Sequence, residues 1–345
     1  MLSGLKSSLQ GLVASKFESA KASQSLTFSS TELAVIESGT DVSFQLRYCP
    51  ALAKKPQKDD SEKAKDKPKK PDPFENPDEA LLITEFPQPN PSHFLVLNKY
   101  TVIPEHFILA TKQNKQQTAL LEQDDLDATY ACLKAWETDN SSKRLFAFFN
   151  SGEHSGASQA HRHVQFLPVE SMVEDESSGK WKILIDLIEQ QGQWRSSYPE
   201  TMMILPVPFL NFGLPIHPHS SPSQLYNIYT RLLEAAESSV RSYISAHPNA
   251  LSLHSTENSA CPISYNLALT TTFMAICPRK SEGYVLRRDD KSEIGIVALN
   301  GTILAGTLMV KGEEEWELLK RDKASFDEIL GAIGIPGTGV GIGRA

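Results

Sequence analysis

Phe149 to Pro168 reads F-N-S-G-E-H-S-G-A-S-Q-A-H-R-H-V-Q-F-L-P. A loop rich in glycine and serine comes directly before a segment in which His161, His163 and Gln165 alternate with other residues. Because side chains in a β-strand alternate between its two faces, a strand here would place both imidazoles and the amide on one face. The stretch therefore predicts a loop that leads into a strand lined with histidines.

These residue types suit chemistry on a phosphate ester. A neutral imidazole is a competent nucleophile near neutral pH when something fixes which ring nitrogen carries the proton. Gly152 and Gly156 would let the backbone approach a phosphate closely, and Ser151, Ser155 and Ser158 add hydroxyl donors. A half-buried strand with structurally satisfied histidines is the alternative for any single histidine. The full set of loop, paired histidines and glutamine favours phosphoryl transfer.

Composition and charge narrow the class of protein. The 345 residues are 40% apolar and 22% charged, which is typical of a soluble globular protein. The formal net charge of -8 gives no electrostatic footprint for nucleic acid, so we expect no nucleic-acid partner. No apolar stretch reaches the roughly 20 residues that span a bilayer, so we expect no membrane partner.

The four cysteines, Cys49, Cys132, Cys261 and Cys277, lie far apart, without a C-x-x-C pair. This spacing indicates neither a zinc ribbon nor a disulfide framework, and it fits a reducing compartment. We therefore expect a protein of the cytoplasm, or of the cytoplasm and the nucleus, without a protein-bound metal.

The chain divides into two halves and a tail in this interpretation. The first half covers residues 1–200 and includes a mobile loop, 53–78, whose Ala53 to Lys70 part holds eight lysines and four acids. A proline-rich stretch from Tyr198 to Pro222 marks the join. The second half covers 201–335, and a glycine-rich flexible tail covers 336–345.

Hydrophobic periodicity predicts individual helices and strands along the chain. Helices are expected within Met1–Ser23, over Asp124–Thr138, Trp181–Glu189 and Ser223–Ser245, the last capped by Ser223, and from Glu313 and Ser325. Strands are expected over Leu33–Ile36, Val42–Tyr48, His93–Leu97, His106–Ala110, Leu145–Phe149, Ser264–Ala268, Phe273–Cys277, Gly283–Arg287, Ile294–Leu299 and Thr302–Val310.

Four segments in order resemble a known family: A-L-A-K-K-P, V-L-N-K-Y-T-V-I-P-E-H-F, S-G-A-S-Q-A-H-R-H-V-Q and S-Y-N-L-A-L-T-T-T-F-M-A-I-C-P-R. They are similar to the fungal diadenosine tetraphosphate phosphorylases, also called ATP adenylyltransferases, of the histidine-triad superfamily. In this branch a glutamine replaces the third histidine. The resemblance implies a GalT-like α+β fold of two related halves, with antiparallel sheets flanked by helices.

The resemblance also implies a reaction. Diadenosine tetraphosphate and phosphate would give ATP and ADP, reversibly, through an adenylyl group held on a histidine. The alternatives are another nucleotidyltransferase of the same fold, such as an ADP-sulfurylase or a hexose-1-phosphate uridylyltransferase, a dinucleoside polyphosphate hydrolase, and a nucleotide binder without turnover. No tightly bound cofactor is implied; Mg²⁺ would accompany the polyphosphate. The partners would be these small molecules, and the protein a monomer or homodimer.

The family's site residues map onto this chain position by position. The resemblance makes His163 the nucleophile, gives the main-chain carbonyl of His161 the role of holding its remote nitrogen, and makes Gln165 a phosphate donor. The implied substrate-binding residues are Lys54, Lys55, Asn98, Lys99, Asn150, Ser155, Gly156, Ala157, Ser158 and Gln159 in the first half, and Asn266, Thr271, Met274 and Arg279 in the second.

Overall fold

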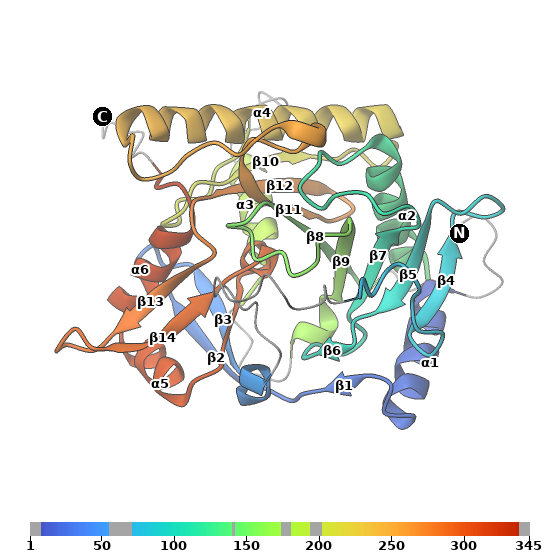
Figure 1. The fold of residues 1–345 in the computed structure, drawn as a ribbon, viewed down its shortest axis with the longest axis horizontal. Coiled ribbons are helices and arrows are strands. Elements are labelled where there is room, and N and C mark those ends of the chain that lie inside the picture. Colours follow the sequence, from blue (N-terminus) through green and yellow to red (C-terminus); the bar gives the residue numbers. More distant parts are fainter. Residues whose placement is uncertain (1–7, 55–70, 140–141, 174–180, 194–201, 338–345) are drawn as a thin grey trace.

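An antiparallel sheet of eight strands crosses the centre of the molecule (Figure 1). The computed structural model describes residues 8–54, 71–139, 142–173, 181–193 and 202–337. From one edge to the other the sheet runs β10 (Phe212–Pro215), β12 (Phe273–Arg279), β11 (Ser264–Leu269), β8 (Leu145–Ser151), β9 (His163–Pro168), β7 (Phe107–Thr111), β5 (His93–Leu97) and β4 (Leu82–Phe86).

Strands from the two halves of the chain pair with each other. In the central sheet β8 pairs with β11, with Asn150 opposite Asn266. A three-stranded sheet joins β2 (Glu32–Glu37) and β3 (Ser43–Tyr48) to β15 (Thr307–Val310), which runs parallel to β3. Smaller pairs join β13 (Gly283–Arg287) to β14 (Glu293–Ala298) and β1 (Thr27–Phe28) to β6 (Tyr100–Thr101).

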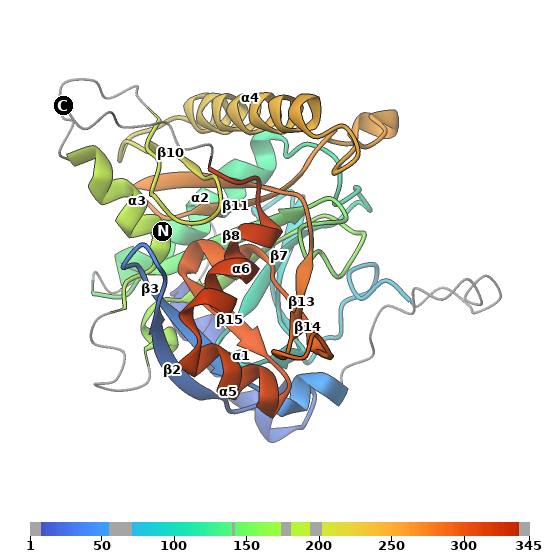
Figure 2. The ribbon, with the colours of Figure 1, turned by 90° about the vertical axis from the view of Figure 1, so that its left-hand side faces the viewer.

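Helices cover both faces of the central sheet. One hydrophobic cluster packs α1 (Leu9–Ala22), α2 (Gln123–Asp139) and α4 (Pro222–Ala246) against one face. The other cluster packs α3 (Leu184–Gln193), α5 (Glu313–Arg321), α6 (Lys323–Ile333) and the three-stranded sheet against the opposite face. Figure 2 shows α5 and α6 beside β2 and β3, with α4 along the top of the molecule. Short 3₁₀ helices cover Pro50–Lys54, Glu170–Met172, Glu257–Ser259 and Gly301–Ala305.

Alternation along β9 places aromatic residues beneath the catalytic candidates. Val164 and Phe166 enter the first cluster, where the Phe166 ring stacks on Phe107 at a centroid distance of 4.7 Å. Burying a phenylalanine contributes roughly 1.5–3 kcal/mol, so this layer fixes the strand firmly. None of the helices in the described part of the chain combines the length and apolarity that a bilayer span requires.

The α+β prediction is confirmed, and most predicted elements are present with boundaries shifted by one to three residues. Two predictions, the cap of one helix and the start of one strand, were wrong. Ser221, not Ser223, caps α4, because Pro222 occupies the first helical turn and Gln224 completes a capping box with Ser221. The predicted strand Thr302–Val310 begins instead as a 3₁₀ helix, Gly301–Ala305, which ends at Gly306 in the left-handed region with φ 70°.

The lysine-rich segment differs from its predicted extent. Residues 55–70 lie outside the described residues, as do 338–345 of the predicted tail. Residues 71–78, which we included in the mobile loop, instead make specific contacts. Phe74 is buried, and the Asp72 side chain bonds both to the backbone of Phe74 and to His161.

Candidate active site

A row of polar side chains crosses one face of the central sheet. His163 and Gln165 point to the face opposite Val164 and Phe166, as predicted from their spacing. The register of β9 with β7 places Gln165 opposite Ile108, so His106, two residues earlier, shares this face. Asn150 on β8 and Asn266 on β11 are direct neighbours. The row therefore brings side chains from both halves of the chain together around His163.

The ring of His163 is held with one nitrogen free to react. Its Nδ1 donates to the main-chain oxygen of His161 at 2.8 Å, so Nε2 keeps its lone pair. Burial lowers the pKa of His163 to about 4, although the hydrogen bond to the carbonyl favours the charged form. His163 is therefore a neutral imidazole at neutral pH, in the form that a nucleophile requires.

Gln117 holds apart the two strands that frame the nucleophile. The pairing of β8 with β9 ends at Phe148 and Gln165. Beyond that point the Gln117 amide lies between the strands: Oε1 accepts from His163 N at 2.8 Å, and Nε2 donates to Asn150 O at 2.8 Å and His163 O at 3.2 Å. The side chain thus replaces the missing strand pairing and satisfies buried backbone groups where the sheet opens.

The loop before His161 depends on two glycines. Gly152 and Gly156 have φ of 88° and 77°, a region that favours glycine. A Cβ on Gly156 would lie 2.7 Å from Leu299 O, so a side chain there would collide with second-half backbone. The hydroxyl of Ser155, predicted to donate to a substrate, donates in this structure to Gly152 O at 2.6 Å and closes the turn.

Asn150 is anchored to the second half of the chain. Its Oδ1 accepts from Asn266 Nδ2 at 2.9 Å and from Gly301 N at 2.8 Å. Asn266 Nδ2 also donates to Ser155 O at 2.9 Å, which ties the glycine loop to the same group. Both predicted residues, Asn150 and Asn266, therefore lie at the site in one hydrogen-bonded unit.

Arg279 was predicted to bind substrate, but the structure uses it internally. Its side chain is 1% exposed. Nη1 donates to Asn266 Oδ1, Nε donates to Ile333 O at 3.2 Å, and Nη2 donates to the carbonyl oxygens of Ser281, Glu282 and Leu299 at 2.9, 3.2 and 3.0 Å. The guanidinium therefore orients Asn266 and the loop before Gly301. Its nitrogens bond to groups of the protein and are not arranged to bind a phosphate through two parallel hydrogen bonds.

Thr271 and Met274 were also predicted to contact substrate, and the structure places both elsewhere. Thr271 lies in the turn after β11, five residues beyond Asn266, which is about 17 Å along an extended strand. Its Oγ1 donates to Glu137 Oε1 at 2.7 Å on α2. Met274 is fully buried in the core among α2 and α4 residues. Both positions serve packing at the far end of the sheet.

The remaining predicted residues lie around the row. Asn98, at the end of β5, donates from Nδ2 to His106 Nδ1 at 3.1 Å. Lys99, Ser158 and Gln159 are exposed, and Ala157 and Gly156 are partly exposed. Lys54 ends the first 3₁₀ helix, and Lys55 lies outside the described residues. In the described part of the chain, no group of three or more histidine, cysteine, aspartate or glutamate residues is arranged to hold a metal ion.

Comparison with known proteins identifies the family of this site. A sequence model of the Ap4A phosphorylase N-terminal domain, where Ap4A is diadenosine tetraphosphate, matches residues 4–181, more than half of the chain. The chain belongs to the Ap4A phosphorylase family. A model of the ATP adenylyltransferase C-terminal domain matches residues 205–336.

Named relatives in Saccharomyces cerevisiae agree with this membership. Diadenosine 5',5'''-P1,P4-tetraphosphate phosphorylase 2 is 29% identical over 316 residues, covering 87% of this chain and 86% of the relative. Protein APA1 is 29% identical over 338 residues, covering 96% and 95%. The crystal structure of yeast Ap4A phosphorylase Apa2 in complex with Ap4A has a TM-score of 0.74 and 25% identity, covering 95% of this chain and 97% of that chain.

The predictions from the sequence missed three residues of this Ap4A phosphorylase-family site. His106 Nε2 lies 3.1 Å from Gln165 Oε1, Gln117 bridges the parted strands, and Asp72 bonds to His161. His106 lies within the V-L-N-K-Y-T-V-I-P-E-H-F segment that carried the resemblance, and its period-two spacing from Ile108 and Ala110 was a usable signal. Gln117 and Asp72 lie in loops without such a signal.

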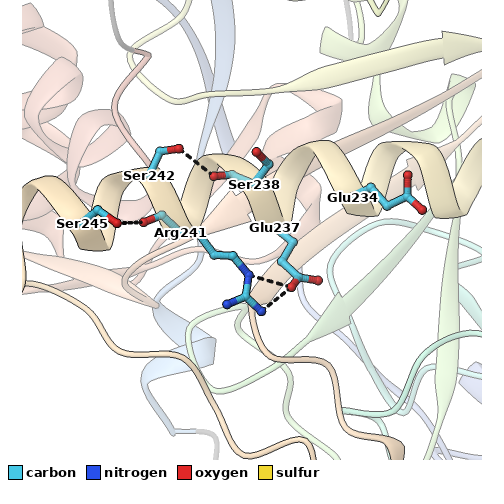
Figure 3. A pocket seen from close by; sticks show the side chains of 6 residues that line it. All are labelled: Glu234, Glu237, Ser238, Arg241, Ser242 and Ser245. Atoms are coloured by element: carbon cyan, nitrogen blue, oxygen red, sulfur yellow. Dashed lines mark hydrogen bonds and ion pairs between the residues drawn. The ribbon is translucent and has the colours of Figure 1, made fainter.

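A surface depression elsewhere has no part in this chemistry. It is lined by Glu234, Glu237, Ser238, Arg241, Ser242 and Ser245, all on the outer side of α4 (Figure 3). Arg241 Nε donates to Glu237 Oε1 at 2.9 Å within the same helix. Such an exposed pair four residues apart contributes a few tenths of a kcal/mol to the helix and forms no ligand site.

Proposed function

We propose that this protein phosphorolyses Ap4A with inorganic phosphate to ATP and ADP, reversibly, through an adenylyl group on His163. The observation that carries the proposal is the hydrogen bond from His163 Nδ1 to His161 O, which leaves a neutral, buried ring with Nε2 available. Membership of the Ap4A phosphorylase family supports the choice of substrate.

The reaction has two displacements at the same phosphorus. In the first, His163 Nε2 attacks the α-phosphorus of one adenylyl group, and the bond to the bridging oxygen breaks so that ATP leaves. The adenylylated ring carries a positive charge, and His161 O accepts its Nδ1–H. In the second, a phosphate oxygen attacks the same phosphorus, the P–N bond breaks, and ADP leaves a neutral His163.

Gln165 favours transfer over hydrolysis in this scheme. Its amide can donate to a phosphate oxygen, but it can neither remove a proton from water nor protonate a leaving group. The adenylyl group therefore persists until phosphate arrives. Backbone donors of the glycine loop and the amide of Asn150 would stabilise the charge on the phosphoryl oxygens, and the bonds from Asn266 to Asn150 Oδ1 and Ser155 O support this role.

Mg²⁺ enters with the polyphosphate and neutralises part of its charge. We also propose a monomer or homodimer in the cytoplasm. The four cysteines are free thiols and buried, which suits a reducing compartment.

Covalent labelling tests the proposal. The full-length protein is incubated with Ap4A radiolabelled at the α-phosphates, without phosphate, and then with phosphate added. We expect acid-labile label on the protein, which phosphate converts into labelled ADP. His163→Ala should take up no label, while His217→Ala, a change at an exposed histidine, should label like the wild type. Label that persists on His163→Ala would place the nucleophile elsewhere, and phosphate that yields no ADP would refute phosphorolysis.

A further inference from the structure

Asp72 contacts the catalytic histidine pair from outside the central sheet. Its Oδ2 lies 2.7 Å from His161 Nδ1, and the other ring nitrogen of His161 lies 2.7 Å from Thr111 O. An ionised carboxylate and a main-chain carbonyl only accept hydrogen bonds, so both ring nitrogens must donate. The contacts therefore make the His161 ring a donor to Asp72 on one side and to Thr111 on the other, with its side chain only 2% exposed.

The turn that carries Asp72 is fitted closely to the site. Asp72 Oδ1 accepts from Phe74 N at 2.9 Å, and Oδ2 also accepts from Asn114 Nδ2 at 3.1 Å. These two bonds hold the carboxylate of Asp72 in the orientation in which it contacts the imidazole of His161. The Phe74 ring packs against His163 at a centroid distance of 5.2 Å and edge-on against His161 at 5.6 Å.

We propose that Asp72 is a positioning residue for the nucleophile. Asp72 and Thr111 clamp the ring of His161 from two sides, and the main chain of the same residue supplies the carbonyl that accepts from His163 Nδ1. Fixing His161 fixes the direction of that carbonyl, and hence the tautomer and plane of His163. Phe74 completes the turn by covering the ring of the nucleophile. This inference rests on the proposed function, because it assigns a role within the adenylyl transfer.

The next turn along the chain contains a matched control. Asp78 Oδ1 accepts from Ala80 N at 2.9 Å, the same local bond that Asp72 Oδ1 makes with Phe74 N. Asp78 lies only six residues further along the chain, and its side chain bonds to Ala80 N within its own turn. Changes at Asp78 therefore reproduce the loss of charge and of a turn bond without touching His161.

The first measurement is the rate of adenylyl-histidine formation in the absence of phosphate, at saturating and limiting Ap4A. A hydrogen bond to a charged group at such a position affects the rate by about 10- to 100-fold. We expect Asp72→Ala to slow the saturated rate by that factor, with half-saturation within about twofold of the wild type. Asp78→Ala should match the wild type in both quantities. Asp72→Asn retains an oxygen for Phe74 N, so it should fold normally and be slowed less than Asp72→Ala.

The second measurement needs no turnover. In ¹⁵N NMR spectra of the imidazoles, His161 should carry protons on both nitrogens in the wild type and on one in Asp72→Asn; its signals are assigned by their loss in His161→Asn. A singly protonated wild-type His161, or an Asp72→Ala protein that adenylylates within twofold of the wild-type rate, overturns the inference. A wild type that takes up no label overturns the proposed function instead, whatever the NMR result.

Discussion

His106 Nε2 lies 3.1 Å from Gln165 Oε1, and this contact decides which end of the glutamine amide is available to a substrate. The amide nitrogen of Asn98 donates to His106 Nδ1 at 3.1 Å, so Nδ1 is the acceptor and Nε2 carries the proton. Gln165 therefore turns its oxygen toward His106, and its NH₂ group is the end that remains for a phosphate oxygen. A chain of three side chains thus orients the donor beside the nucleophile.

Removing the His106 donor should misorient Gln165. We expect His106→Leu to lower kcat for Ap4A phosphorolysis by about 10-fold or more, since a freed amide can present either end to the phosphate. His106→Gln, which retains a donor, should recover part of this loss. Steady-state rates with excess phosphate measure the effect. A kcat for His106→Leu within twofold of the wild type would show that Gln165 needs no such support.

Replacing Gln165 by an ionisable residue should admit water. Gln165→His should raise hydrolysis relative to transfer, because an imidazole can take a proton from water while an amide cannot. The measurement is the ratio of AMP to ADP formed from Ap4A at fixed phosphate. Gln165→Leu is the control, in which both products should fall without a rise in their ratio. An unchanged ratio in Gln165→His would contradict the role given to glutamine.

Loss of the Gln117 amide should destabilise the protein where β8 and β9 part. Gln117→Met removes three hydrogen bonds to the backbone, and a buried unsatisfied group costs about 1–3 kcal/mol. We expect urea unfolding to show a loss of at least that size, together with slower adenylylation. Gln116→Met, at the exposed neighbouring position, should leave both unchanged. Equal stability of the two variants would mean that water replaces the amide without loss.

The rate of adenylylation should be nearly independent of pH from 8 to about 5.5. Burial lowers the pKa of His163 to about 4, so the neutral imidazole predominates throughout this range. A histidine with the ordinary pKa of about 6.5 would lose roughly nine-tenths of its nucleophilic form at pH 5.5. Single-turnover labelling at each pH distinguishes the two cases. A midpoint near pH 6.5 would indicate that His163 is solvated in the reacting complex.

The same shift should make stability depend on pH. Between about pH 6.5 and pH 4 the unfolded chain binds a proton on His163 that the folded protein does not, so the free energy of unfolding falls as the pH is lowered. From pH 7 to pH 5 this contribution is about 2 kcal/mol. Urea unfolding of the wild type should lose that amount relative to His163→Asn over the same interval. Parallel losses in both proteins would assign the acid sensitivity to other groups.

Hydrophobic periodicity and turn-forming residues predicted much of the fold. Strands β5 and β13 have the predicted bounds, because each is a short run of strand-forming residues between turn residues. The alternation around Arg162 and Val164 was enough to place His163 and Gln165 on one face, since this depends only on strand geometry. The 3₁₀ helix Gly301–Ala305 was missed because its cap, Asn300, and the left-handed Gly306 override an apolar run that resembles a strand.

The contacts that the second half of the chain and the loops make at the site could not be predicted from local sequence patterns. The positions of Arg279, Thr271 and Met274 were predicted from the resemblance alone. The register of β11 and β12 places Thr271 and Met274 far from Asn266. The guanidinium of Arg279 is buried and donates to carbonyl groups. Gln117 and Asp72 depend on loops that approach the histidines only after the sheet has formed. Contacts between distant segments carry no local pattern.

The pairing of β8 with β11 has a consequence for synthesis of the chain. Asn150 bonds to Asn266, which lies 116 positions later in the chain. Because a ribosome adds about 5–20 residues per second, this edge of β8 stays unpaired for on the order of ten seconds during synthesis. During that interval an apolar strand with unpaired backbone groups is open to pairing with another nascent chain. The strand that leads to the nucleophile thus keeps one edge unpaired until β11 has been made.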